Sequence, residues 1–101
     1  MNLLSFYISE KQHHDGKLLY EWLLEEARGL GVHGGSAFRA IASFGRHGKM
    51  HEETFFELAG ELAMKVEFIL DDELARKLLD KVGAQNMNVF YVKLPVQSGV
   101  A

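Results

Sequence analysis

The sequence predicts an α+β fold, a ferredoxin-like βαββαβ sandwich with a four-stranded antiparallel sheet and two helices on one face. Two observations support this prediction. Two amphipathic helical segments alternate with four apolar, strand-like segments, and both halves of the chain follow the same strand–helix–strand order. A chain of 101 residues with 48% hydrophobic residues has room for one such core. We therefore expect a single domain over residues 1–95.

The first half of the chain supplies a strand, a helix and a second strand. Leu3–Ile8 is almost uniformly apolar, which is typical of a central strand. In Lys17–Leu30, apolar residues recur at spacings of three and four, which predicts an amphipathic helix. We expect Asp15 to cap the start of this helix and Gly31 to end it. Ser36–Phe44 then supplies the second strand.

The second half repeats this order. Met64–Leu70 alternates between apolar and polar residues, as a strand with one buried face does. Asp71-Asp72 is expected to cap a second helix that Gly83 ends. Asn88–Leu94 forms the fourth strand, and we expect Pro95, the only proline, to end it.

Two segments fall outside these elements. Residues 96–101 are expected to form a flexible C-terminal tail. Glu52–Leu62 contains apolar residues that fit either a short amphipathic helix or an extended segment entering the third strand, and we favour the extended segment.

One face of the predicted sheet has no helix to cover it. Its side chains mix large apolar groups with charges, and we expect them to be Ser5, Tyr7, Arg39, Ile41, Lys65, Glu67, Ile69, Tyr91 and Lys93. Half-apolar faces on small domains usually find partners. We therefore expect an interface between subunits, in which Arg39 or Lys65 meets Glu67 of a neighbouring chain. The alternative is a solvent-exposed face with scattered Tyr and Ile residues.

The segment after the second strand is the strongest candidate for a binding site. Gly45 opens a polar loop that carries four basic or titratable side chains: Arg46, His47, Lys49 and His51. A guanidinium offers a bidentate fork and an ammonium a point charge, so together they suit phosphate or carboxylate. Long polar loops mounted on rigid strands tend to carry binding sites. The alternative interpretation is a solvated loop with ordinary surface cations.

A metal site is a second hypothesis for the same loop. His47 and His51 are four residues apart, imidazole suits zinc, copper or nickel, and Glu52 or Glu10 could complete a ligand set. This spacing brings two histidines together only on a helix, and Gly48 disfavours one. No cofactor is identified. Glu10, at the end of the first strand, is the acid we single out, either paired with Lys17 or bound to a ligand amine.

Composition excludes several other classes. A net charge of −3 argues against a nucleic-acid binder, and the absence of cysteine excludes disulfides and thiolate metal sites. No signal peptide and no apolar run of ~20 residues is present, so we expect a cytoplasmic protein without membrane insertion. Ser9 and Ser36 lie near His13 and His33 in sequence, but nothing positions a base or an oxyanion hole, so we expect no enzymatic activity.

Several landmarks occur in a characteristic order and spacing: Glu10, Gly16–Tyr20, Gly31–Ser36, Phe44–His51, Phe55–Leu58 and Val66–Asp71. This combination resembles the DUF190 family of small PII-like proteins. The resemblance implies a ferredoxin-like fold that assembles into a homotrimer, with effectors bound in clefts between subunits. It also implies that the loop between the second and third strands contacts partner proteins. The PII turn that helps to hold nucleotide phosphates corresponds here to Gly83–Met87, which carries no cation.

The residues and the resemblance together predict a signalling or sensor protein. Its effector would be a small molecule, anionic or of nucleotide type, and its partner protein would bind the loop at residues 45–53. The predicted ligand-binding residues are Glu10, Arg39, Gly45, Arg46, His47, Lys49 and His51. The alternative is a CutA-like trimer that binds a divalent metal through His47 and His51.

Overall fold

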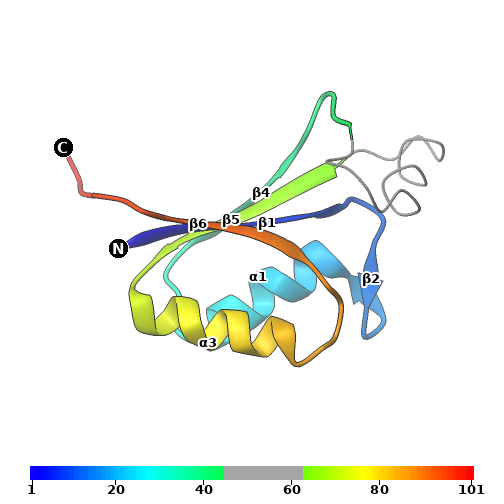
Figure 1. Cartoon of the computed structure of the whole chain (residues 1–101), viewed down its shortest axis with the longest axis horizontal. Helices are drawn as coiled ribbons and strands as arrows, with labels where there is room; N and C mark the ends of the chain where they lie inside the picture. The colour runs from blue at the N-terminus through cyan, green and yellow to red at the C-terminus, as the bar shows by residue number, and fades with distance from the viewer. Residues whose placement is uncertain (45–62) are drawn as a thin grey trace.

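The structure, a computed structural model, describes residues 1–44 and 63–101. The elements follow in the order β1 Asn2–Ser9, β2 His13–His14, β3 Lys17–Leu18, α1 Leu19–Gly29, β4 Gly35–Arg39, β5 Ala63–Leu70, α3 Asp72–Gly83 and β6 Phe90–Pro95. The main sheet has the strand order β4-β5-β1-β6 with antiparallel neighbours throughout. The helices α1 and α3 lie on one side of this sheet, and no helix of the described residues lies on the other side (Figure 1). The predicted ferredoxin-like fold is confirmed.

The core lies between the two central strands and the two helices. Phe6 of β1 stands opposite Val66 of β5, and both side chains are fully buried on the helix side. Leu23 of α1 and Leu78 of α3 close this layer from below, and both are also fully buried. Burying one such side chain contributes roughly 1.5–3 kcal/mol, so this layer holds the sheet and helices together.

The first helix begins later than predicted, and Asp15 does not cap it. A short hairpin, β2–β3, precedes α1, and its turn consists of Asp15 (φ 53°) and Gly16 (φ 79°). Lys17 pairs with His14 in this hairpin, so its backbone is extended. The helix therefore starts at Leu19 without a side-chain cap.

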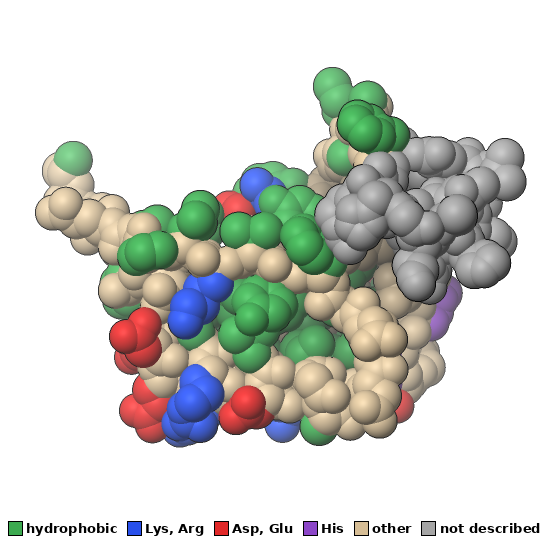
Figure 2. Space-filling view, viewed as in Figure 1, with side chains coloured by type: hydrophobic (Ala, Val, Ile, Leu, Met, Phe, Trp, Pro, Cys, Tyr) green, Lys and Arg blue, Asp and Glu red, His purple; other side chains and the backbone are tan. Residues whose placement is uncertain are grey.

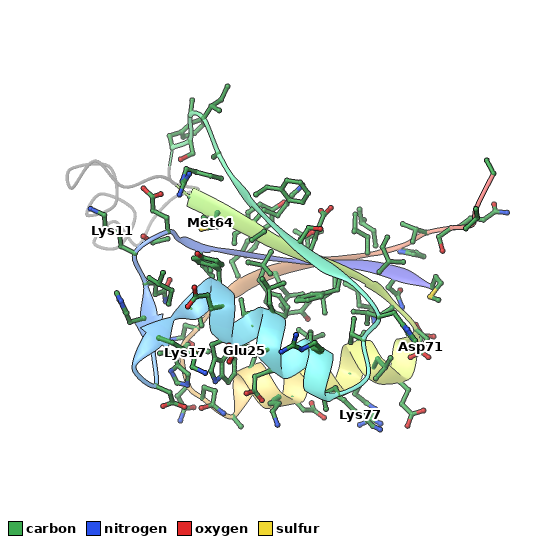
Figure 3. All side chains as sticks on the ribbon, turned by 180° about the vertical axis from the view of Figure 1, so that it is seen from behind. Lys11, Lys17, Glu25, Met64, Asp71 and Lys77 are labelled. Atoms are coloured by element: carbon green, nitrogen blue, oxygen red, sulfur yellow. The ribbon has the colours of Figure 1, made fainter. Side chains whose placement is uncertain are left out.

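The ends of the helices follow the predictions more closely. Gly31 has φ 99°, the left-handed conformation expected just after α1. Asp71 caps α3, because its Oδ1 accepts a hydrogen bond from the backbone N–H of Leu74 at 2.8 Å. Figure 3 shows Asp71 at the start of this helix. The helix ends at Gly83, as predicted.

Two strands have bounds other than the predicted ones. β4 ends at Arg39, and the apolar side chains of Ile41 and Phe44, predicted to extend it, are almost fully exposed. β6 begins at Phe90 because Asn88 has a positive φ of 56°, and it runs through Pro95, which stands opposite Asn2. Proline fits there because β6 is an edge strand.

The backbone N–H of Val96 donates to the carbonyl oxygen of Met1 at 3.0 Å, and residues 97–101 then lead away from the sheet as an exposed segment (Figure 1). The flexibility of residues 96–101 and the domain boundary at residue 95 stay predictions. No helix among the described residues has the length and hydrophobicity to cross a bilayer.

Candidate functional site

The described part of the candidate site lies where β4 ends and β5 begins. Arg39, the last residue of β4, stands opposite Met64, and the backbone N–H of Ala40 donates to the carbonyl oxygen of Ala63 at 2.9 Å. These contacts fix both ends of the segment that contains the predicted binding loop. Gly45, Arg46, His47, Lys49 and His51 lie outside the described residues, as does Glu52–Leu62 with its alternative of helix or extended segment.

Two of the predicted site residues are in direct contact. The Nε of Arg39 donates to Oε1 of Glu10 at 2.6 Å, although 29 residues separate them in sequence. The side chain of Glu10 is 20% exposed and that of Arg39 is 63% exposed. The structure therefore joins the end of β1 to the end of β4 by an ion pair at the base of the loop.

Lys17, which we expected as a partner of Glu10, pairs with a different acid. Its Nζ lies 2.6 Å from Oε1 of Glu25 on α1, and Figure 3 labels both residues on the hairpin and helix. The hydrogen bond to Lys17, followed by its charge, lowers the pKa of Glu25. The same hydrogen bond raises the pKa of Lys17.

The turn that carries Glu10 is held by several hydrogen bonds. The backbone N–H of Gln12 donates to the carbonyl oxygen of Ser9 at 3.2 Å, and that of Lys11 donates to the Ser9 hydroxyl at 3.3 Å. The carbonyl oxygen of Gln12 accepts from the N–H of Leu19 at 2.7 Å. Ser9 itself is buried. Glu10 therefore projects from a backbone that is tied to both β1 and α1.

The uncovered sheet face is more apolar than the sequence suggested. Directly opposed residues of antiparallel strands point to the same side of a sheet. Phe38 stands opposite Lys65, so Phe38 lies on the uncovered face, whereas Arg39 stands opposite the buried Met64 and lies on the helix side. The expectation that Arg39 lies on the uncovered face is therefore wrong. Ile41, expected on the same face, lies beyond the end of β4.

The sheet face predicted for the side chains of β6 was also wrong. Tyr91 stands opposite Phe6, and Lys93 stands opposite Leu4, so both lie on the helix side. The uncovered face instead contains Phe90, whose ring lies 5.8 Å from that of Tyr7. We call this surface the open face and define it as Leu3, Ser5, Tyr7, Ser36, Phe38, Lys65, Glu67, Ile69, Phe90, Val92 and Leu94.

Large apolar side chains dominate the open face. Tyr7, Phe38, Ile69, Phe90 and Leu94 are each between 41% and 50% exposed. Figure 2 shows hydrophobic side chains gathered along the upper side of the sheet, away from the helices. This surface has the composition of an interface rather than of a solvated sheet.

The charges on the open face are paired within the chain. Nζ of Lys65 lies 3.2 Å from Oε2 of Glu67 and 5.4 Å from the centre of the Phe38 ring. The sequence predicted that Lys65 would meet Glu67 of another chain. In the folded chain the two are already partners, so the face carries no net charge from this pair.

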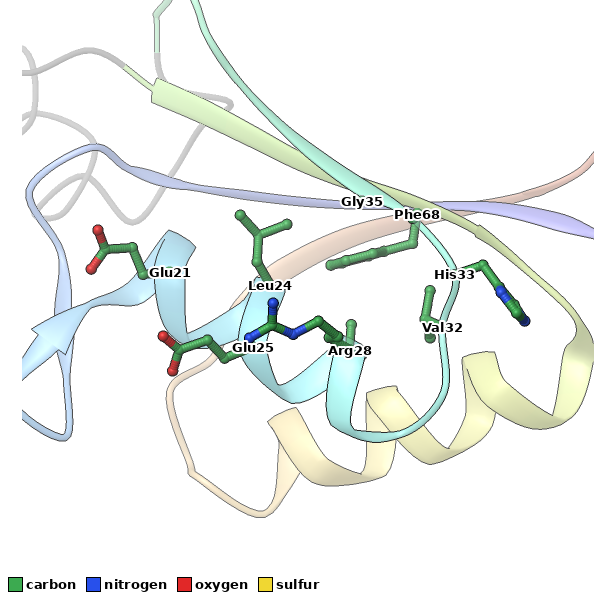
Figure 4. A pocket seen from close by; sticks show the side chains of 10 residues that line it. Glu21, Leu24, Glu25, Arg28, Val32, His33, Gly35 and Phe68 are labelled. Atoms are coloured by element: carbon green, nitrogen blue, oxygen red, sulfur yellow. The ribbon is translucent and has the colours of Figure 1, made fainter.

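Sequence reasoning missed a groove of about 550 Å³ beside α1 and the start of β4. Leu24, Val32 and the ring of Phe68 provide apolar lining, and Glu25, Arg28 and His33 provide polar lining (Figure 4). A Cβ at position 35 would collide with the Phe68 ring. The glycine at this position was the signal available in the sequence.

His14 has a structural role. Nε2 of His14 lies 3.0 Å from Oε1 of Gln85, and its ring packs edge-on against Trp22 at 4.8 Å. Across residues 1–44 and 63–101, no three His, Cys, Asp or Glu side chains come together as a metal site. The metal hypothesis on His47 and His51 falls outside these ranges.

The described elements define the class: a ferredoxin-like α+β domain in which α1 and α3 lie on one side of a four-stranded sheet, with a long connection between β4 and β5. The chain belongs to the DUF190 family, whose model, described as "Uncharacterized ACR, COG1993", matches residues 1–95.

Two known proteins show the likeness in sequence and in fold. The chain is similar to a UPF0166 protein from Aquifex aeolicus (strain VF5), with 34% identity over 80 residues, which cover 79% of this chain and 76% of that protein. It also resembles a crystal structure described as that of a candidate PII-like signalling protein from Thermus thermophilus. That match has a TM-score of 0.56 at 17% identity and covers 92% of this chain and 81% of the other. The second likeness shows a shared fold.

Proposed function

We propose that this protein is a non-enzymatic PII-like signalling or sensor protein that acts as a cytoplasmic homotrimer. An anionic small molecule, of nucleotide or other type, binds at the boundary between subunits, and residues 45–53 contact a partner protein. The observation that carries this proposal is the guanidinium of Arg39 at the base of the loop, on an edge strand of a sheet whose open face is apolar.

Self-association is supported by the open face. A small domain rarely leaves a contiguous row of half-exposed aromatic and aliphatic side chains in water. The ion pair in this row, Lys65–Glu67, is internal, so covering it leaves no unpaired charge from either side chain. A closed ring of identical chains covers the same face on every copy.

Effector binding is supported by the loop base. Arg39 presents a guanidinium, the group best suited to phosphate or carboxylate, and four more basic or titratable side chains follow it in sequence. An effector regulates a partner only if it binds one conformation of the protein more tightly than another. The contact of Arg39 with Glu10 gives the loop base one arrangement that an effector can stabilise or replace.

A thermal-shift screen tests this function. A ligand that binds the native state raises the melting temperature by an amount that grows with its concentration relative to Kd. We expect stabilisation by nucleotides or small carboxylates, and loss of that shift in Arg46→Ala. Stabilisation by zinc or copper alone, abolished in His47→Ala, would instead establish the CutA-like metal-binding function.

A further inference from the structure

We propose that Glu10 is a positioning residue that holds the Arg39 guanidinium as a preformed receptor for one oxyanion group, a phosphate or a carboxylate, of the effector. This inference rests on the proposed function and deepens it, because it assigns the contact that recognises the anion and the residue that orients it.

The geometry of the ion pair carries the first step. Glu10 accepts from Nε of Arg39, the nitrogen nearest the backbone, at 2.6 Å. A guanidinium has five N–H donors in a planar fork, and this contact uses only the one on Nε. The two terminal nitrogens can therefore bind a second oxyanion through two parallel hydrogen bonds.

Exposure indicates from which side each partner acts. The Glu10 side chain is 20% exposed, whereas that of Arg39 is 63% exposed. Glu10 therefore binds Arg39 from the more buried side, and the greater part of the Arg39 side chain remains exposed to solvent. A ligand can reach such a group without first displacing Glu10.

Both backbones at this contact are already fixed. Arg39 ends a paired strand, and the next residue, Ala40, is hydrogen-bonded to Ala63. Glu10 lies in the turn that Ser9 and Gln12 hold together. A long side chain that is ordered before binding loses less conformational entropy when the ligand arrives, so the arrangement favours affinity.

The Lys17–Glu25 pair provides a contrast within the same chain. It has the same length, 2.6 Å, but both side chains are about equally exposed, at 41% and 49%. A lysine ammonium is a point charge without a planar fork, so it cannot be held at one nitrogen and offer a bidentate edge. Substitutions of this pair therefore make matched controls.

Isothermal titration calorimetry of the full chain with ATP, pyrophosphate and citrate tests the proposal. Arg39→Gln and Arg39→Lys should each weaken binding by at least about tenfold, because neither replacement offers the fork. Glu10→Ala should weaken it by roughly five- to tenfold, because the guanidinium is no longer oriented. Glu10→Gln keeps an acceptor oxygen for Nε and should stay within about threefold of wild type. Lys17→Gln and Glu25→Ala should bind like wild type.

The outcomes separate this inference from the proposed function. If none of the three anions binds the wild-type protein, the effector part of the proposed function fails, and the inference fails with it. If an anion binds wild type and both Arg39 variants equally, the anion site lies elsewhere and only the inference is overturned. Glu10→Ala binding as tightly as wild type, or more tightly, would show that Glu10 competes for Arg39 rather than orienting it. Arg39→Lys keeps the charge, so it supplies the affinity test if Arg39→Gln does not fold.

Discussion

Gly35 is a residue at which packing is especially tight. A Cβ built there would lie 2.6 Å from Cδ1 of the Phe68 ring and 3.1 Å from Cδ2 of Leu24. Phe68 is buried in the core, so its ring has little room to move away. Glycine at this position lets the edge strand β4 lie close to α1.

We predict that Gly35→Ala lowers the free energy of unfolding by about 1–3 kcal/mol, the usual range for overpacking a core. Urea denaturation measures the change. Gly34→Ala is the matched control, because a Cβ at Gly34 meets nothing within 4 Å. Equal stability of the two variants would contradict the close packing of β4 on Phe68.

Asp72 makes the stability of the fold depend on pH in the acid range. Nδ2 of Asn2 donates to Oδ1 of Asp72 at 2.7 Å, and this hydrogen bond, with a smaller contribution from the charge of Lys93, lowers the pKa of Asp72. Because the pKa is lower in the folded state than in the unfolded state, the carboxylate stabilises the fold above its unfolded pKa. That contribution is lost as the pH falls through the folded-state pKa.

Asn2→Ala should raise the pKa of Asp72 towards its ordinary value, because the hydrogen bond to the carboxylate is gone. An NMR titration that follows the Asp72 side-chain carbonyl measures this pKa directly. The variant should also lose less of its remaining stability on acidification than wild type does. An unchanged Asp72 pKa would show that Asn2 is not the main cause of the shift.

Among the elements, α3 depends most clearly on its first residues. The Asp71 side chain caps the helix through the N–H of Leu74. We predict that Asp71→Ala costs about 1 kcal/mol of stability and that Asp71→Asn costs much less, since asparagine also caps well. Chemical denaturation of the two variants checks this. A loss of stability in Asp71→Asn as large as that in Asp71→Ala would assign the effect to charge rather than to the cap.

The type of each element was predictable from the sequence, because the spacing of apolar residues agreed with the residues that begin and end helices and strands. The apolar stripe of α3, its cap at Asp71 and its end at Gly83 all followed from local residue chemistry. The start of α1 did not, because Asp15-Gly16 fits a helix cap and a hairpin turn equally well in sequence. The hairpin pairing of His14 with Lys17 decides between them.

The face that each side chain takes was less predictable. A strand assigned one residue out of phase moves every side chain to the other side of the sheet. On β4, the register places Gly35, Ala37 and Arg39 on the helix side, where a Cβ at Gly35 would collide with Phe68, so Phe38 lies on the open face. Tyr91 lies on the helix side of an edge strand, but its side chain remains 47% exposed. A polar, half-exposed residue of this kind was therefore assigned to the wrong face of the sheet.

Of the predicted site residues, the structure describes Glu10 and Arg39, and their contact could not be predicted from the sequence. Glu10 was selected because it ends a strand, and Arg39 as a cation expected on the sheet face between subunits. Their ion pair depends on the order of strands in the sheet, which places the ends of β1 and β4 on either side of β5. Pairing of this kind has no signature in the local sequence.

At the scale of the whole molecule, the open face is the surface on which the described part of the fold leaves large apolar side chains partly exposed. Helices cover one side of the sheet, and five large apolar side chains occupy the other at about half exposure. We propose that identical chains cover this surface and thereby bring the loop base beside a neighbouring subunit. On this face, Nζ of Lys65 lies 5.4 Å from the centre of the Phe38 ring.

Light scattering coupled to size-exclusion chromatography tests this central claim most directly. We expect a particle of three copies of the 11.4 kDa chain, about 34 kDa, for the wild-type protein. Phe38→Glu and Ile69→Glu should each give single chains, because they place unpaired carboxylates in the covered surface. Lys77→Glu, on the exposed side of α3, should leave the assembly intact. A wild-type protein that elutes as one 11.4 kDa chain would contradict the proposed assembly.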